Sequence, residues 1–207
     1  MSANTNLITV VTLLVCLFSL NSAASNIIEK ATGKNSAVSL GKCQSSAKEG
    51  VRHDDLAKQL SEHAFILLGK AKFSVLFWDI YESQLLTSDG RHPFSNVCQY
   101  ALFEIQYLRD ISKKELIENT VSQWQHLAFD ENEYRAFIPL LENIWPDIKA
   151  GDQLSMLNQM AITSFYLNEK KIGDIESLTF AKAFLSIWLD KNTSEPKLRK
   201  KLLGDSI

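Results

Sequence analysis

The chain of 207 residues is almost neutral, with 22 Lys and Arg against 24 Asp and Glu and a formal net charge of −2. It is 45% hydrophobic with only 8 Gly and 4 Pro, which excludes a disordered or collagen-like chain because enough apolar surface exists to offset the entropy lost on folding. A nucleic-acid binder of the usual basic kind is also excluded, since neutralising phosphates requires a clear excess of Lys and Arg. The length fits one core, so we expect one folded domain.

The longest apolar run lies at the N-terminus. It covers residues 7–20, and the first charged residue is Glu29. A helix that crosses a bilayer needs about 20 apolar residues, so this shorter run is more typical of the central region of a secretory signal, with small residues before a cleavage point at Ala24. We therefore predict a signal peptide over residues 1–24. Because residues 1–6 contain no Lys or Arg, an uncleaved anchor and a buried helix stay open as alternatives.

Residues 25–55 are rich in Ser, Lys, Asn, Ala and Gly and have no periodic apolar pattern, which predicts a polar tether ahead of a folded domain over residues 56–207. Cleavage near Ala24 removes Cys16 and leaves Cys43 and Cys98. An exported compartment permits a disulfide between these two. Two separate thiols are the alternative, because sequence spacing does not establish geometry.

The first half of the predicted domain has strand-like patterns after one short amphipathic turn over residues 54–64. In the second strand the alternation of apolar and polar residues is imperfect, since Phe77 and Trp78 are adjacent. We therefore expect a single strand there that is covered on both faces or interrupted by a bulge. The predicted strands cover residues 64–69, 71–86 and 98–108.

The second half combines helices with a β-meander. Ser112 and Glu115 form a capping box at the start of a helix, and Pro139 is expected to weaken or kink the next one. The predicted helices cover residues 112–127, 134–145, 178–189 and 196–203, and the predicted strands cover residues 154–158, 161–167 and 171–175. This order of elements predicts an α+β fold, an antiparallel sheet with a layer of helices on one face.

The residue types that carry catalysis or bind metals form no recognisable cluster. The four histidines (His53, His63, His92 and His126) lack the spacing of metal ligands, and no pair of cysteines has zinc-binding spacing. Phosphate-binding glycine loops and the GxSxG motif of hydrolases are absent from the sequence. We therefore expect no metal and no cofactor, and we expect core packing for the four tryptophans.

Several segments, in the same order along the chain, resemble the bacterial chalcone isomerase-like family. The first reads GKAKFSVLFWDIYESQL over residues 69–85 and is similar to the family's strand motif, which has a Gly, a Phe and a late Tyr. The next, ALFEIQYLRDISKKEL over residues 101–116, resembles the following strand and the start of the helix. Further similar segments cover residues 151–152, 167–173, 180–189 and 198–204. The resemblance implies an open-faced β-sandwich, and with the leader it implies a protein exported to the periplasm of a Gram-negative type of cell.

The plant enzymes of this family cyclise chalcones, guided by an Arg, a Thr, a Tyr, an Asn and a late Ser or Thr. The Arg position falls near Lys70 or Lys72, and the Thr position falls near Leu76 or Phe77, which have no hydroxyl. The Tyr and Asn positions fall near Leu116 and Gln123, so only the late hydroxyl is retained, as Ser186. The resemblance thus implies a domain that has lost most of the catalytic groups.

Other members of the fold bind fatty acids without converting them. We therefore predict a non-catalytic, exported domain that binds a small amphipathic ligand such as a fatty acid, with a Lys to neutralise a carboxylate. The predicted cleft also involves Phe73 and Phe77, and the predicted ligand-binding residues are Lys72, Trp78, Tyr81, Tyr107 and Ser186. The alternatives are a scaffold that binds a protein partner and an isomerase of the chalcone type.

Overall fold

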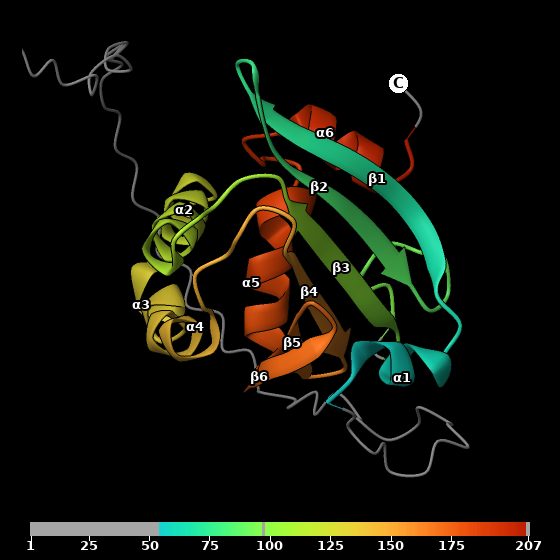
Figure 1. Cartoon of the computed structure of the whole chain (residues 1–207). Helices are drawn as coiled ribbons and strands as arrows, with labels where there is room; N and C mark the ends of the chain where they lie inside the picture. The colour runs from blue at the N-terminus through green and yellow to red at the C-terminus, as the bar shows by residue number, and fades with distance from the viewer. Residues whose placement is uncertain (1–53, 97, 206–207) are drawn as a thin grey trace, which may run out of the picture. The chain divides into compact units, whose positions relative to one another are not determined.

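The computed structural model of the chain describes residues 54–96 and 98–205. Its centre is a six-stranded antiparallel sheet in which every strand pairs with its neighbour along the chain, in the order β1-β2-β3-β4-β5-β6 (Figure 1). The strands are β1 (Ile66–Val75), β2 (Trp78–Thr87), β3 (Tyr100–Tyr107), β4 (Gln153–Gln159), β5 (Ile162–Leu167) and β6 (Lys170–Glu176). This simple meander places all six strands in one sheet with two faces.

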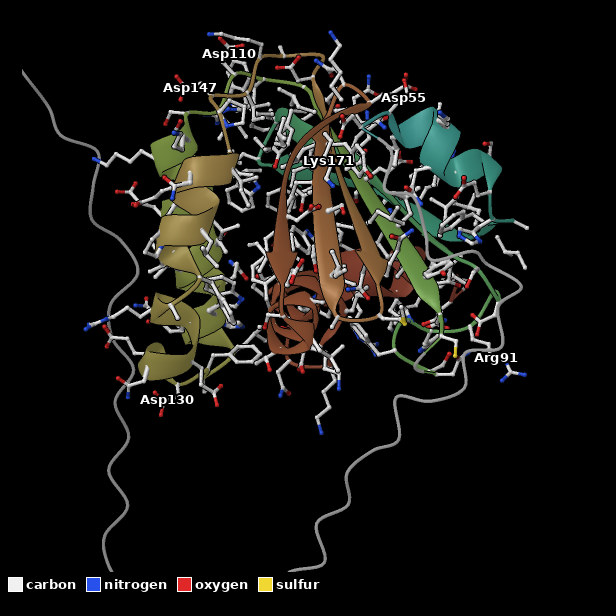
Figure 2. The ribbon with its side chains drawn as sticks, turned by 90° about the horizontal axis from the view of Figure 1, so that it is seen from below. Asp55, Arg91, Asp110, Asp130, Asp147 and Lys171 are labelled. Carbon is white, nitrogen blue, oxygen red and sulfur yellow. The ribbon has the colours of Figure 1, made fainter. Side chains whose placement is uncertain are left out.

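Helices cover the two faces of the sheet unequally. The helices are α1 (Leu56–Ser61), α2 (Lys113–His126), α3 (Glu131–Arg135), α4 (Ile138–Ile144), α5 (Leu178–Leu189) and α6 (Pro196–Leu202). Figure 2 shows α2, α3 and α4 on one side of the strands and α1 on the other side. The main core forms on the first side, and only a small cluster around Leu56, Leu102 and Tyr166 holds α1 on the second side. The predicted α+β fold is confirmed.

Alternation along each strand separates these two faces. In β3, Phe103 and Ile105 belong to the main core, whereas Leu102 belongs to the small cluster and Glu104 lies between polar neighbours. Because successive side chains of a strand point to opposite faces, the same alternation continues across the paired strands, except at register shifts in the β1–β2 and β5–β6 pairs. We call the side with the main core the inner face and the side with α1 the outer face.

The predicted strand over residues 71–86 is wrong as a single element. The structure folds this stretch into a hairpin in which Val75 pairs with Trp78 and the chain turns at Leu76 and Phe77. Two-residue hairpin turns usually contain Gly or Asn, which adopt positive φ at low cost. Here Leu76 adopts a φ of 54°, so no turn residue in the sequence indicates the reversal.

Most other predicted elements are found at their expected places. The capping box of α2 is present, with the Ser112 hydroxyl accepting a hydrogen bond from the Glu115 N–H and the Glu115 carboxylate accepting one from the Ser112 N–H. The expected helix over residues 134–145 is divided into α3 and α4, because Pro139 lies in the first turn of α4, where its missing N–H costs little. Thus Pro139 starts a helix instead of kinking one.

Aromatic side chains hold helices α2 and α5 against the inner face of the sheet. Trp124 of α2 is fully buried, and its Nε1–H donates a hydrogen bond of 2.9 Å to the Ala183 carbonyl of α5. On α5, Phe180 and Phe184 stack on each other with ring centroids 5.5 Å apart, and both contact Phe165 of β5. These contacts fix the positions of α2 and α5 and so determine how much space remains between the two helices and the sheet.

The predicted signal peptide over residues 1–24 and Cys43 lie outside the described residues, as does most of the tether predicted over residues 25–55. Cys98 is disulfide-bonded, and it is the one cysteine among the described residues. Its predicted pairing with Cys43 therefore stays a prediction. Among residues 54–96 and 98–205, no helix has the length and apolar character needed to cross a membrane.

Candidate ligand-binding site

A cavity of about 390 Å³ lies between the inner face of the sheet and helices α2 and α5. Its volume is within the usual range of ligand pockets, which is about 300–1,000 Å³. Strands β1 to β5 supply its floor with Phe73, Val75, Ile80, Tyr81, Phe103, Ile105, Tyr107, Leu154, Met156 and Phe165. The rest of the lining comes from Arg109, Ile111, Glu115, Leu116, Asn119, Thr120, Gln123, Trp145, Phe184, Ile187, Trp188, Ser194 and Glu195.

The inner part of the cavity is apolar and largely aromatic. Phe103, Phe165 and Phe184 line it from β3, β5 and α5, and all three are buried. Met156 of β4 contributes a flexible side chain to the same wall. Side chains of this kind stabilise an apolar ligand by removing its surface from water, but they cannot pair with a charged group. We therefore expect the tail of a ligand here and its polar group elsewhere.

Two phenol groups lie in the wall of the cavity, Tyr81 on β2 and Tyr107 on β3. Tyr81 Oη accepts a hydrogen bond of 2.9 Å from Trp188 Nε1–H, so its own hydroxyl hydrogen is available to donate. Burial raises the pKa of Tyr81 to about 12, and burial also raises the pKa of Tyr107, with the neighbouring Tyr81 as a smaller cause. Both groups are therefore neutral hydrogen-bond donors at physiological pH.

The lining also contains an unpaired donor. Trp145, which follows α4, is buried, and its Nε1 has no hydrogen-bond partner among the described residues. Buried polar groups are nearly always paired, and each exception requires an explanation. A ligand oxygen in the cavity would supply the missing acceptor for this indole N–H.

The rim of the cavity is polar and exposed. Arg109, just after β3, places Nη2 3.6 Å from Glu115 Oε1 of α2, and their side chains are 51% and 48% exposed. Hydrogen bonds from the backbone and hydroxyl of Ser112, with the nearby Arg109 cation, hold the pKa of Glu115 below its ordinary value. Glu115 is therefore an anion at neutral pH. Among the described residues, Arg109 is the one cationic residue of the cavity lining.

The structure brings together only two of the five predicted ligand-binding residues, Tyr81 and Tyr107, whose rings are 6.1 Å apart. Lys72 does not line the cavity, because it points to the outer face, where its Nζ lies 3.0 Å from both Asp79 Oδ2 and Glu82 Oε1. A second, more polar hollow lies on that face, and its lining includes Lys72 and Glu82.

The other two predicted residues are also outside the lining of the cavity. Trp78 is exposed at the β1–β2 turn, together with Phe77, because the chain reverses there instead of continuing as a strand. Ser186 lies on α5, and its hydroxyl donates a hydrogen bond of 2.7 Å to the Ala183 carbonyl within the helix. The ligand-binding roles of all five residues stay predictions.

Sequence reasoning did not select Arg109, Asn119, Trp145 or Trp188. Asn119 could have been found, because Leu116, Asn119 and Gln123 lie at helical spacing on one side of α2 and all three line the cavity. Arg109 lies two residues after the end of β3, a strand that is buried over most of its length, which is a weak signal. Nothing in the sequence indicates that Trp145 lacks a partner for its N–H.

No group of three or more His, Cys, Asp and Glu side chains within the described part of the chain is arranged to hold a metal ion. A sequence profile described as "Chalcone isomerase-like" matches residues 45–204, well over half of the chain. The chain belongs to the chalcone isomerase-like family.

Two individual proteins extend the comparison with this chalcone isomerase-like chain. An uncharacterized protein of Haemophilus influenzae is 21% identical over 140 residues, which cover 66% of this chain and 67% of that protein. The crystal structure of a fatty-acid binding protein of Arabidopsis thaliana superposes with a TM-score of 0.54 at 11% identity, covering 68% of this chain and 87% of the plant protein. At that identity the likeness shows a shared fold.

The residues that the family resemblance assigned to catalysis are dispersed in the structure. Lys72 points to the outer face and Phe77 lies in the exposed turn. Leu116 and Gln123 do line the cavity, but neither has a side chain that exchanges a proton at physiological pH. The arrangement in this chalcone isomerase-like chain is therefore suited to holding a ligand by its apolar part and its polar end.

Proposed function

We propose that the chain binds a small amphipathic molecule, such as a fatty acid, in the cavity and does not convert it. The observation that carries the proposal is an apolar cavity of about 390 Å³ in which Arg109, at the rim, is the single cation that the described part of the chain contributes. A fatty acid has the same division into an apolar chain and an anionic end. The fold shared with a fatty-acid binding protein supports the same ligand class.

The energetics of such binding follow from the lining. Each buried methylene group of a tail contributes about 0.8 kcal/mol, so several methylene groups against Phe103, Phe165 and Phe184 offset the cost of association. The carboxylate would pair with Arg109 in place of Glu115, whose contact with Arg109 is long at 3.6 Å and exposed. A polar oxygen deeper in the cavity would accept from Tyr81, Tyr107 or the unpaired N–H of Trp145.

Native mass spectrometry of the full chain, followed by lipid extraction, tests this proposal. We expect a bound amphiphile to co-purify, and we expect palmitate to raise the melting temperature by mass action. Ile105→Trp fills the cavity from β3 and should abolish both effects, whereas Ile66→Trp makes the same change at an exposed position of β1 outside the cavity and should preserve them.

Three results would contradict the proposal. The first is purified protein that carries no ligand and whose melting temperature does not respond to palmitate. The second is equal loss of binding in the Ile66→Trp control. The third is turnover in a chalcone cyclisation assay, which would instead support an isomerase.

We propose further that the chain is exported to a periplasm after cleavage near Ala24. The support is the sequence of residues 1–24, with its apolar run and the small residues that precede the cleavage point. N-terminal sequencing of the protein from a periplasmic fraction should begin at Ser25. Full-length protein retained in the membrane fraction would favour the uncleaved anchor.

A further inference from the structure

The turn between β1 and β2 exposes an unusual amount of apolar surface. We call residues 75–78 the hairpin tip. Leu76, Phe77 and Trp78 are 88%, 98% and 75% exposed, far more than any other large hydrophobic side chain of the described residues, and Val75 is also exposed. A continuous group of exposed large apolar residues marks an interaction site more often than a single one does.

The turn between β1 and β2 does not require large apolar residues in order to form. Leu76 occupies a positive-φ position that Gly or Asn would adopt with less strain. The base of the tip is well braced, because Asp79 accepts hydrogen bonds from Ser74 Oγ at 2.6 Å and from Lys72 Nζ at 3.0 Å. The hairpin therefore holds a strained, apolar turn in water. Because this arrangement lowers the stability of the protein, we infer that the turn has a function.

The hairpin tip adjoins the cavity. Val75 belongs to the tip and also lines the cavity. Phe73 and Ile80, which lie on either side of the tip in the sequence, line the cavity as well. In Figure 1 the β1–β2 hairpin reaches past the ends of the neighbouring strands. Apolar surface therefore continues from the end of the hairpin to the cavity wall.

We propose that the hairpin tip inserts into the surface of a lipid bilayer and that the cavity exchanges its ligand there. This inference deepens the proposed function and rests on it, since an amphipathic ligand is concentrated in membranes. A stable protein interface buries about 800 Å² on each partner, which is more than four side chains at a turn provide. A bilayer requires only a few apolar side chains, and Trp is favoured at its interface.

The charges near the hairpin tip indicate an apolar mode of binding. Lys72, Asp79 and Glu82 form a mutually paired group at its base, so no unpaired cation there attracts anionic lipids. We therefore expect binding to uncharged phosphatidylcholine vesicles, with little dependence on salt.

Trp78 provides a built-in probe, because Trp124 and Trp145 are buried and Trp188 is partly buried within the core. With the full chain and phosphatidylcholine vesicles, we expect a blue shift of tryptophan fluorescence and quenching by lipids brominated on their acyl chains. Trp78→Phe should remove most of this signal while vesicle sedimentation continues to detect binding.

The double variant Leu76→Ser, Phe77→Ser should weaken sedimentation with vesicles at least about tenfold, because it removes two large apolar side chains. The control is Met160→Ser, which changes an exposed apolar residue that also has positive φ, at the turn between β4 and β5. The control should bind vesicles like the unaltered chain. Both variants should bind palmitate from solution normally, which separates this inference from the proposed function.

Absence of sedimentation by the unaltered chain would overturn the inference, and so would equal loss in the Met160→Ser control. Binding that requires phosphatidylglycerol and disappears at high salt would show an electrostatic contact elsewhere on the surface. Loss of a dimer on gel filtration of the double variant without lipid would assign the tip to self-association. If vesicle binding holds but palmitate never binds, the proposed function fails and the membrane contact remains.

Discussion

Replacing Arg109 with Ala tests how the proposed ligand is held. Of the residues that the structure describes, Arg109 is the one cation in the cavity lining, and its side chain is 51% exposed. Hydrogen bonds to charged groups contribute about 1.5–3 kcal/mol, and an exposed site takes the lower end of that range because solvent screens the charges. The expected loss for palmitate is therefore about 1.5 kcal/mol, or roughly tenfold in Kd. The melting temperature should change little, since the ion pair with Glu115 is exposed.

Isothermal titration with palmitate and with hexadecanol provides the assay. The alcohol has the same tail without the charge, so Arg109→Ala should weaken palmitate binding and leave hexadecanol binding unchanged. Lys72→Ala is the matched control, because Lys72 points to the outer face and is paired with Asp79 and Glu82. Unchanged palmitate binding by Arg109→Ala, or a loss on Lys72→Ala alone, would refute this placement of the carboxylate.

Three further predictions concern the fold. Gly69→Ala should destabilise the protein by about 1–3 kcal/mol in chemical denaturation, because a Cβ there would lie 2.0 Å from the Lys201 carbonyl oxygen of α6; unchanged stability would show that α6 moves freely. Because burial raises the pKa of Tyr81 to about 12, the unfolded chain loses that proton first, and the free energy of unfolding should fall as the pH rises from about 10 toward about 12. Tyr81→Phe should make this fall shallower, and an identical slope would count against burial of the phenol. Cys98 should resist alkylation until the full chain is reduced, and labelling without reductant would contradict the disulfide.

Much of the architecture could be predicted from local patterns. The capping box at Ser112 and Glu115 specifies the start of α2 within one turn. The turn between β5 and β6 is also found where the sequence predicts it, with Asn168 and Glu169 both at positive φ. Pro196 in the first turn of α6 and Gly204 after its end follow the usual asymmetry of helix termini. In each of these cases a residue of a suitable type favours the geometry, although the positive φ of Glu169 is not typical of its residue type.

The hairpin between β1 and β2 could not be predicted in the same way. Its turn is made of Leu76 and Phe77, residues whose types indicate a strand. The prediction of a single strand also puts Phe77 and Trp78 in the expected cleft, whereas the structure exposes both residues. The residues of the predicted site that do line the cavity, Tyr81 and Tyr107, lie within strands, where alternation determines the face.

The sequence also does not show to which face of the sheet the Lys72 side chain points. Because side chains alternate along a strand, Lys72 points to the opposite face of the sheet from Ala71 and Phe73. Only the tertiary packing shows which of the two faces α2 and α5 cover. Arg109 lies outside any strand, and the path of the chain after β3 brings it to the rim of the cavity. The position of Arg109 at the rim can therefore be known only from the assembled fold.

A crystal structure of the full chain with palmitate would test the central claim most directly. We expect electron density for the tail between the sheet and α5, in contact with Phe165 and Phe184, and we expect the carboxylate within hydrogen-bonding distance of Arg109. A cavity that contains no ligand, with palmitate bound instead on the outer face beside Lys72, would contradict it.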